Sequence, residues 1–170
     1  PEGENIDKDY LAINPLGTVP AIEIDGNIIC GSEEIIYQLD KIDPNNCSLY
    51  PDNVDETDIR KWASHTTITD GVKFASTLGT IMPVFSSPLL QYMIKALPFS
   101  SIMKILLRHP RNDRKMIFTA MYFGNPSKKI PFMGVNNYVD EIIKLENLLS
   151  DGRSFFYNTF SHVDINLMCV

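Results

Sequence analysis

The stretch NPLGTVPAIEIDG, residues 14–26, constrains the fold more than any other part of the 170-residue chain. Proline has no backbone N–H, and a sheet tolerates it chiefly at the first residue of a strand, so Pro20 marks where a strand begins. Residues 21–24 alternate as a half-buried strand does, and Asp25-Gly26 is a hairpin-turn signal that a second apolar run follows. The sequence therefore predicts a short β-hairpin entered through Pro20.

The Val19-Pro20 peptide bond leaves two possibilities open. An X–Pro bond reaches the cis form at a cost of about 0.5–1 kcal/mol, against about 2.5–4 kcal/mol for other residues. In the cis form, the turn can direct the N–H and C=O of Val19 outward, where an extended peptide can pair with them as with a strand edge. In the trans form, the same residues are an ordinary entry to an edge strand.

Ser32 is the second signal. It precedes apolar residues at helical spacing, so we expect it to cap a helix that runs to about residue 42. A helix N-terminus has free backbone N–H groups and about half a positive charge, and it readily holds a carboxylate. The alternative is an N-cap without a ligand.

Charge and cysteine content exclude some classes of function. The net charge of −6 argues against nucleic acid as the main partner, because a phosphate backbone attracts a basic face. The three cysteines and three histidines stand at no metal-ligand or disulfide spacing. We therefore expect free thiols in a reducing compartment and no metal.

After a linker rich in proline, asparagine and aspartate, the pattern becomes helical. A helix is predicted from residue 55 to about residue 79, and Pro83 and Pro88 are expected to break the chain. The apolar run at residues 88–107 approaches the length of a membrane span. A lysine at the bilayer centre costs about 2.5–3.5 kcal/mol. Because this run contains two lysines, we expect two short buried helices hinged at Pro98 and not a membrane span.

Further helices are predicted at residues 111–123 and 136–149. Near the end of the chain, Ser161 and Asp164 have the spacing of a capping box, with aspartate in place of the usual glutamate. This spacing predicts that a helix begins after Ser161.

The ordered combination of the N-terminal signals resembles the glutathione-binding domain of the cytosolic glutathione S-transferase family. That family carries Asn-Pro-x-Gly-x-Val-Pro-x-Leu, a short hairpin, Glu/Gln-Ser-x-x-Ile-x-x-Tyr-Leu and then Leu-Tyr-Pro. The family also begins the core helix of its helical domain with a Ser/Thr-x-x-Asp box. The matching positions in the first pattern are Asn14-Pro15, Gly17, Val19-Pro20, Ser32, Ile35 or Ile36, Leu39 and Leu49-Tyr50-Pro51.

The resemblance implies an α/β domain followed by an all-α domain. We expect a truncated thioredoxin-like, glutathione-binding domain at residues 1–46, a linker at residues 47–54 and a partial all-helical domain at residues 55–170. The family's N-terminal βαβ unit would precede Pro1 and its last helices would follow Val170. Because the Tyr, Ser or Cys that activates the thiol lies in that βαβ unit, no catalytic residue is assigned in this chain.

The resemblance also implies how glutathione binds. In the family the Val-Pro bond is cis, the valine backbone pairs with the cysteinyl unit, and the serine holds the γ-glutamyl carboxylate. Asp70 is matched to an aspartate that in some classes reaches glutathione in the other subunit, and the alternative is a solvated helix residue. Gly31 replaces the family's Glu or Gln before the serine. The expected glutathione-binding residues are Thr18, Val19, Pro20, Gly31, Ser32 and Asp70.

The function implied is conjugation of the glutathione thiolate to small apolar electrophiles, a detoxification reaction of a cytoplasmic homodimer, with glutathione as co-substrate. The electrophile is expected against the helical domain, with plain core as the alternative role of the candidate residues Met82, Phe85, Met116, Met121 and Tyr122. A noncatalytic binding or assembly module of the same fold is the second hypothesis, and Gly31 favours it. A membrane-associated member is the third, and a membrane partner is not expected.

Overall fold

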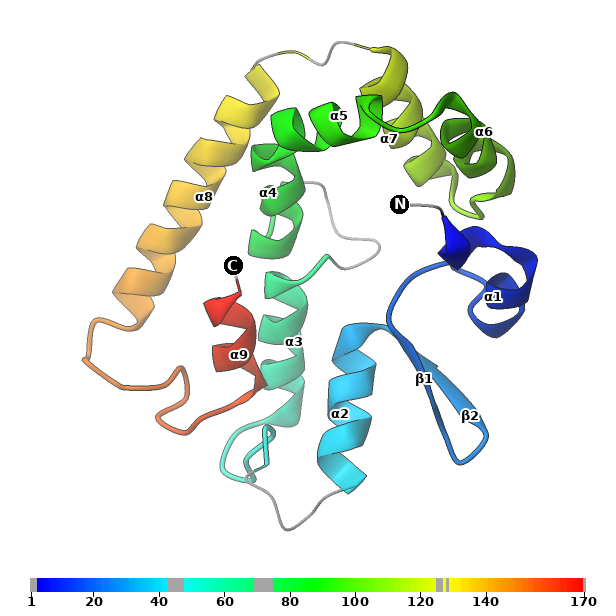
Figure 1. The fold of residues 1–170 in the computed structure, drawn as a ribbon. Helices are drawn as coiled ribbons and strands as arrows, with labels where there is room; N and C mark the ends of the chain where they lie inside the picture. The colour runs from blue at the N-terminus through cyan, green and yellow to red at the C-terminus, as the bar shows by residue number, and fades with distance from the viewer. Residues whose placement is uncertain (1–2, 43–47, 69–74, 125–126, 128, 170) are drawn as a thin grey trace. The chain divides into compact units, whose positions relative to one another are not determined.

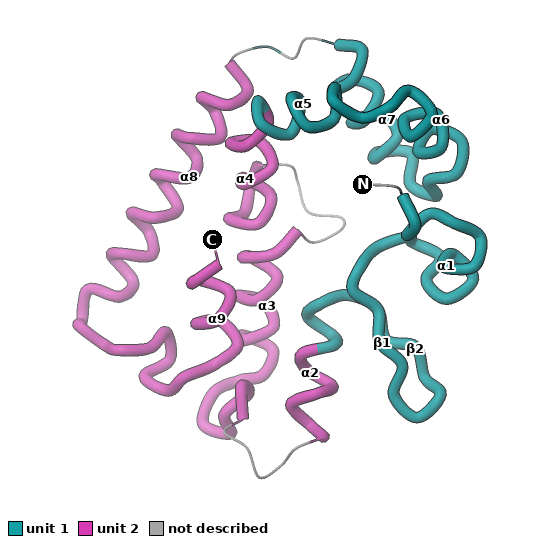
Figure 2. Tube along the Cα trace, in the orientation of Figure 1, with its two compact units in different colours: residues 1–35, 88–127 teal, residues 36–87, 128–170 magenta. Residues whose placement is uncertain are grey.

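The computed structural model describes residues 3–42, 48–68, 75–124, 127 and 129–169. The chain divides into two compact units, residues 1–35 with 88–127 and residues 36–87 with 128–170 (Figure 2). Each unit has buried apolar side chains of its own, such as Ile6 and Ile102 in the first unit and Ile59 in the second. The division at residues 46 and 55 stays a prediction.

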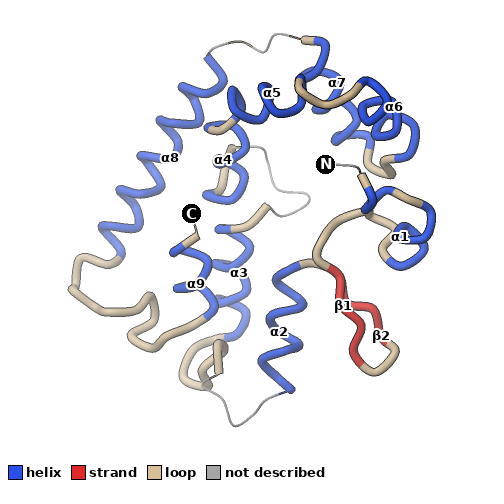
Figure 3. The backbone as a smooth tube through the Cα atoms, viewed as in Figure 1, coloured by secondary structure: helices blue, strands red, loops and turns tan. Residues whose placement is uncertain are grey.

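The first unit begins with a 3-10 turn η1 (Glu4–Ile6) and helix α1 (Lys8–Ile13), followed by strands β1 (Ala21–Ile24) and β2 (Asn27–Cys30) (Figure 1). The strands pair antiparallel from Ala21 opposite Cys30 to Ile24 opposite Asn27. Asp25 and Gly26 have φ angles of 50° and 79°, as a type I′ turn requires. The predicted hairpin is confirmed, and Figure 3 shows it as the strand pair of the described chain.

Helix α2 (Ser32–Ile42) ends at residue 42 as predicted, but it begins one residue earlier than predicted. Ser32 is its first helical residue and not its cap, because the carbonyl of Gly31 accepts the hydrogen bond from the N–H of Ile35 at 3.0 Å. Gly31 has a φ angle of +90°, a conformation that glycine adopts without the steric cost of a side chain.

Helices α5 (Ser87–Lys95), α6 (Phe99–Arg108) and α7 (Asn112–Phe123) follow. The two short helices on either side of Pro98 are confirmed, with Pro98 as the N-cap of α6. Within the described residues, no helix is long and apolar enough to cross a bilayer. The expected burial is wrong, because Tyr92 of α5 is 75% exposed and Leu107 of α6 is 73% exposed.

The second unit contains α3 (Glu56–Thr66), α4 (Leu78–Phe85), α8 (Lys129–Leu148) and α9 (His162–Met168). The single helix predicted over residues 55–79 is wrong, since α3 ends at Thr66 and α4 begins at Leu78. The hydroxyls of Thr66 and Thr67 donate to the carbonyl of Ala63 at 2.8 and 3.2 Å. These side-chain bonds compete with the backbone ladder at the end of α3.

Pro83 and Pro88 do not break the chain as expected. Pro83 lies inside α4, and Pro88 is the second residue of α5. The first turn of a helix tolerates proline because its N–H groups have no intrahelical partner. Pro83 gives up one backbone hydrogen bond, but buried neighbours on α4, Ile81 and Val84, hold that helix in the core.

Two apolar clusters form the core of the second unit. In one, Ile59 of α3 packs with Phe156 and with Val163 of α9. In the other, Ala75, Ile81 and Val84 pack with Ile130 and Tyr138 of α8. Helix α8, which begins seven residues before the predicted start at residue 136, lies beside α4 (Figure 1).

The capping box at the start of α9 is confirmed. The carboxylate of Asp164 accepts from the N–H of Ser161 at 2.8 Å and from its hydroxyl at 2.9 Å. It also accepts from the N–H of Phe156 at 2.7 Å, a contact outside the box. Asp164 therefore holds both the start of α9 and the segment that leads to it.

Candidate functional site

The loop before β1 is held by the buried side chain of Asn14. Its Nδ2 donates to the carbonyl and to the hydroxyl oxygen of Thr18 at 2.8 and 3.0 Å, and its Oδ1 accepts from the N–H of Leu16 at 3.1 Å. The hydroxyl of Tyr10 donates to the same Thr18 carbonyl at 2.5 Å. Thr18 is therefore fixed by two neighbouring side chains, and its carbonyl is directed at them.

Gly17 closes this loop. Its φ angle is +63°, and a Cβ there would lie 3.1 Å from the carbonyl oxygen of Asn5. Nδ2 of Asn5 donates in turn to the carbonyl of Gly17 at 2.6 Å. The glycine of the Asn-Pro-x-Gly pattern is thus required by both its backbone conformation and this close approach.

Val19 follows the loop and precedes the strand pair. The Val19-Pro20 peptide bond is cis. The β1–β2 ladder begins at Ala21, so Val19 lies outside it, and its side chain is 69% exposed. Among the described residues, none forms a hydrogen bond with the N–H or C=O of Val19.

One backbone hydrogen bond brings the two halves of the predicted site together. The N–H of Gly31 donates to the carbonyl of Pro20 at 3.2 Å, directly beyond the Ala21–Cys30 pair. Ser32, exposed at the start of α2, is therefore next to the Val19-Pro20 turn. Five of the six predicted residues lie in this part of the first unit, and Asp70 lies outside the described residues.

The electrostatics at the start of α2 have two opposing parts. The backbone N–H groups of its first turn attract an anion, while Glu33 and Glu34 occupy the same turn. The sequence showed Gly31 only as a missing acidic or amide side chain. The structure adds a physical reason, since a side chain at φ +90° would be strained.

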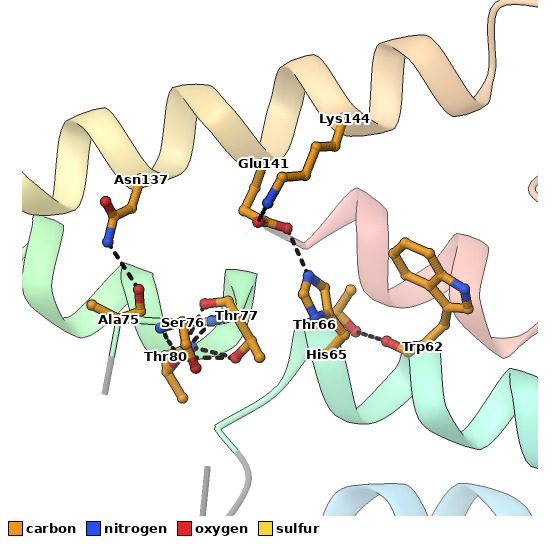
Figure 4. A network of polar contacts seen from close by, with 10 residues as sticks. All are labelled: Trp62, His65, Thr66, Ala75, Ser76, Thr77, Thr80, Asn137, Glu141 and Lys144. Atoms are coloured by element: carbon orange, nitrogen blue, oxygen red, sulfur yellow. Dashed lines mark hydrogen bonds and ion pairs between the residues drawn. The ribbon is translucent and has the colours of Figure 1, made fainter. Parts of the chain in front are cut away.

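Polar side chains also join α3 to α8 in the second unit (Figure 4). Nε2 of His65 lies 2.8 Å from Oε2 of Glu141, and Lys144 binds the other carboxylate oxygen. Burial acts to raise the pKa of Glu141, but hydrogen bonds from Lys144 and His65 outweigh it and hold that pKa below its ordinary value. The ring of Trp62 meets His65 edge-on with centroids 5.4 Å apart.

This His65–Glu141 pair was not anticipated from the sequence. The two residues are 76 positions apart, and a single histidine and a single glutamate at that separation form no recognisable motif. The pair forms a polar contact between α3 and α8. None of the predicted glutathione-binding residues belongs to it.

A cavity of about 300 Å³ lies elsewhere in the second unit. Its walls come from the segment that follows α8 and from α9, and they include Phe155, Phe160 and Leu167. It contains none of the predicted site residues. Across the described residues, no cluster of His, Cys, Asp and Glu side chains has the arrangement of a metal site.

Comparisons with known proteins support the resemblance of the N-terminal region to a glutathione-binding domain. The family described as "Glutathione S-transferase, N-terminal domain" matches residues 1–46. No curated protein matches the chain. Among solved structures, β-etherase LigF from Sphingobium sp. strain SYK-6 matches with a TM-score of 0.77 at 18% identity, over 99% of this chain and 67% of that one.

The structural likeness establishes the fold, a thioredoxin-like N-terminal region followed by a helical C-terminal domain. The match to residues 1–46 rests on the same segment that carries the Asn14 loop, the Val19-Pro20 turn and Ser32. Residues 1–46 are therefore similar to the N-terminal domain of glutathione S-transferases, and the chain as a whole shares the fold of that structural relative.

Proposed function

We propose that this chain binds glutathione at the Val19-Pro20 turn and the start of α2. The observation that carries the proposal is the hydrogen bond from Gly31 N–H to the Pro20 carbonyl, 3.2 Å. It puts the peptide edge of Val19, which has no hydrogen-bond partner among the described residues, beside a helix N-terminus. A tripeptide with an extended backbone and a terminal carboxylate needs both features within a few ångströms of each other. The match of residues 1–46 to the glutathione S-transferase N-terminal domain supports glutathione as that tripeptide.

Each part of the site has a distinct role in this proposal. The N–H and C=O of Val19 pair with the cysteinyl unit of glutathione as one strand pairs with another. The Ser32 hydroxyl and the first N–H groups of α2 hold the γ-glutamyl carboxylate. Thr18 is held away from the ligand by Asn14 and Tyr10, so it positions Val19 instead of contacting the tripeptide through its carbonyl.

The reaction proposed is transfer of glutathione to a small apolar electrophile. An unperturbed thiol has a pKa of about 8.5 and is mostly protonated at neutral pH, so a donor that stabilises the thiolate raises its reactivity. The thiolate sulfur forms a bond to the electrophilic carbon, and the leaving group departs with its electron pair. A homodimer in the cytoplasm is part of the same proposal.

The test is a calorimetric titration of the chain with reduced glutathione. Replacing Ser32 by alanine should weaken binding about 10- to 100-fold, the range for one hydrogen bond to a charged group. Ser100→Ala is a matched control, because Ser100 is an exposed serine at the second residue of α6. Absence of binding to the wild-type chain, or an equal loss in both variants, would refute the site.

A noncatalytic binding module is the second candidate function. It is favoured by Gly31, which removes a side-chain contact to the γ-glutamyl group, and by Glu33 and Glu34 in the first turn of α2. Turnover of an aryl halide and of a β-aryl ether, the latter because the structural relative is a β-etherase, separates the two candidates. Glutathione binding without turnover of either substrate would favour the noncatalytic module.

A further inference from the structure

The basic residues of this acidic chain are concentrated in one segment of the first unit. Residues 88–123, which form most of α5, all of α6 and all of α7, contain six of the 15 lysines and arginines but only one of the 21 acidic residues. The segment therefore carries a net charge of +5, while the rest of the chain carries −11. The basic residues are Lys95, Lys104, Arg108, Arg111, Arg114 and Lys115.

The same helices direct apolar side chains toward solvent. On α5, Leu89, Tyr92 and Met93 are exposed at i, i+3 and i+4 spacing, so they form one face of the helix. On α7, Met116 and Phe123 are exposed seven residues apart and therefore also share a face. This pattern is the reverse of a helix that buries its apolar side against the protein.

The opposite side of α5 shows that the helix is oriented with this apolar face outward. Nε2 of Gln91 donates to the carbonyls of Met121 and Gly124 at 3.3 and 3.1 Å, so a polar residue of α5 is directed at the end of α7. The exposed apolar face of α5 is thus a consequence of packing within this unit. We use the name α5–α7 surface for the exposed apolar side chains of these helices: Leu89, Tyr92 and Met93 on α5, Leu107 on α6, and Met116 and Phe123 on α7.

Basic residues are next to these exposed residues in the sequence. Lys95 ends α5, Arg108 follows the exposed Leu107, and Lys115 precedes the exposed Met116. Asp7 pairs with Lys104 and Arg108, and Asp113 pairs with Arg111 and Arg114. The six basic residues exceed these two carboxylates, so the group of charges stays positive. The positive charge also acts on His109, whose pKa is lowered first by burial and then by the charges of Arg111 and Arg114.

We propose that the α5–α7 surface docks on an anionic membrane surface. The apolar side chains would enter the boundary between headgroups and acyl chains, while the lysines and arginines pair with lipid phosphates. This peripheral mode differs from the membrane span considered for residues 88–107. Nucleic acid would engage the cations but would leave the exposed leucine, methionine and phenylalanine side chains in water, so the observations favour lipid.

Cosedimentation of the whole chain with lipid vesicles tests the proposal without glutathione. Vesicles of phosphatidylcholine are compared with vesicles that contain about one-third phosphatidylserine. We expect binding at least about tenfold tighter to the anionic vesicles and weaker binding as salt is raised. Equal binding to both vesicles, or no binding to either, would overturn the proposal, as would tighter binding of a structured RNA in competition.

Variants at exposed positions separate the two parts of the interaction. Leu89→Ser with Met116→Ser should reduce binding to anionic vesicles about tenfold or more. Val139→Ser with Ile143→Ser is the matched control, because these residues are 48% and 54% exposed on α8. An equal loss in the two double variants would contradict a docking surface at α5–α7.

The charge contribution is tested in the same way. Lys95→Gln with Lys115→Gln should weaken binding and reduce its salt dependence. Lys8→Gln with Lys61→Gln removes two exposed lysines outside the segment and should leave binding unchanged. Circular dichroism of each variant verifies that its helices are intact, and identical behaviour of the two lysine pairs would refute the role of the segment's charge.

Discussion

The hydroxyl of Tyr50 lies 2.8 Å from Nδ1 of His162, which is fully buried at the start of α9. The N–H of His162 donates to the carbonyl of Leu49 at 3.0 Å. The Leu-Tyr-Pro segment is thus joined to α9 through one side-chain and one backbone hydrogen bond. This relationship gives the tyrosine of that motif a structural role in the second unit.

Replacing Tyr50 by phenylalanine should destabilise the protein by about 1–3 kcal/mol, because it keeps the ring but removes the hydrogen-bond partner of a buried nitrogen. Urea unfolding measures the change. Tyr92→Phe, at a tyrosine that is 75% exposed, is the control and should change the free energy of unfolding very little. Equal effects of the two substitutions would be inconsistent with the role of Tyr50.

Asp164→Ala should lower the free energy of unfolding by about 1–3 kcal/mol. It removes the acceptor of the N–H groups of Ser161 and Phe156, one a capping interaction and the other a separate hydrogen bond. Thermal unfolding is compared with that of Asp140→Ala, at an exposed aspartate of α8. A melting temperature as high as that of the control variant would argue against the Asp164 contacts.

The stability of the protein should depend on the ionisation of Glu141. Its folded-state pKa lies below the ordinary value of 4.5, although burial opposes this, because Lys144 and His65 hydrogen-bond to the carboxylate. The stabilisation is therefore fully present above the ordinary pKa and is lost as pH falls through the folded value. Glu141→Gln should destabilise the protein at pH about 7, and the difference should shrink between about pH 5 and pH 3.

Urea unfolding of the wild type and of Glu141→Gln across that pH range measures the effect. Glu146→Gln, at an exposed glutamate of the same helix, is the control and should show a smaller dependence on pH. A constant difference between wild type and Glu141→Gln at every pH would exclude a contribution from the carboxylate charge.

Gly134→Ala should be destabilising even though alanine favours helix by about 1 kcal/mol over glycine. A Cβ at this position of α8 would lie 2.8 Å from the backbone nitrogen of Phe85 in α4, and a backbone atom cannot move aside cheaply. Overpacking of this kind costs about 1–3 kcal/mol. Asn136→Ala, at an exposed position of α8, should not destabilise, and chemical denaturation of both variants decides the sign.

Asn14→Ala should weaken glutathione binding as well as stability. The buried Asn14 side chain fixes Thr18 and therefore the position of Val19, so its loss removes the order of the peptide edge. Asn14→Asp keeps an acceptor for Leu16 N–H but loses the donor to Thr18, and it should also bind weakly. Calorimetric affinities unchanged in both variants would show that this loop does not position the ligand.

Local signals predicted the hairpin and the α9 capping box correctly. Asp25-Gly26 and the Ser161–Asp164 spacing each act over four residues or fewer, so the sequence contains the whole interaction. The same reasoning joined α3 and α4 into one helix, because composition does not show the hydroxyls of Thr66 and Thr67 competing for the Ala63 carbonyl. Helical pattern alone was insufficient there.

Contacts between residues that are distant in the sequence could not be predicted from it. Periodicity identified α5 and α6, but it cannot say which face packs inward, and Tyr92 proved exposed where burial was expected. Similarly, Val19 and Ser32 were singled out as site residues, whereas Asn5, Tyr10 and the buried side chain of Asn14 that order the loop became visible only in three dimensions. The binding roles of the site residues stay predictions.

The two backbone hydrogen bonds that Asp164 accepts couple the local opening of the chain at Phe156 to that at Ser161. Because one carboxylate accepts from the amides of both Phe156 and Ser161, neither amide can be released by rotation of that side chain without loosening the other. Their protons should therefore exchange with deuterated solvent at closely similar rates, as a single cooperative opening, even though five positions separate them along the backbone.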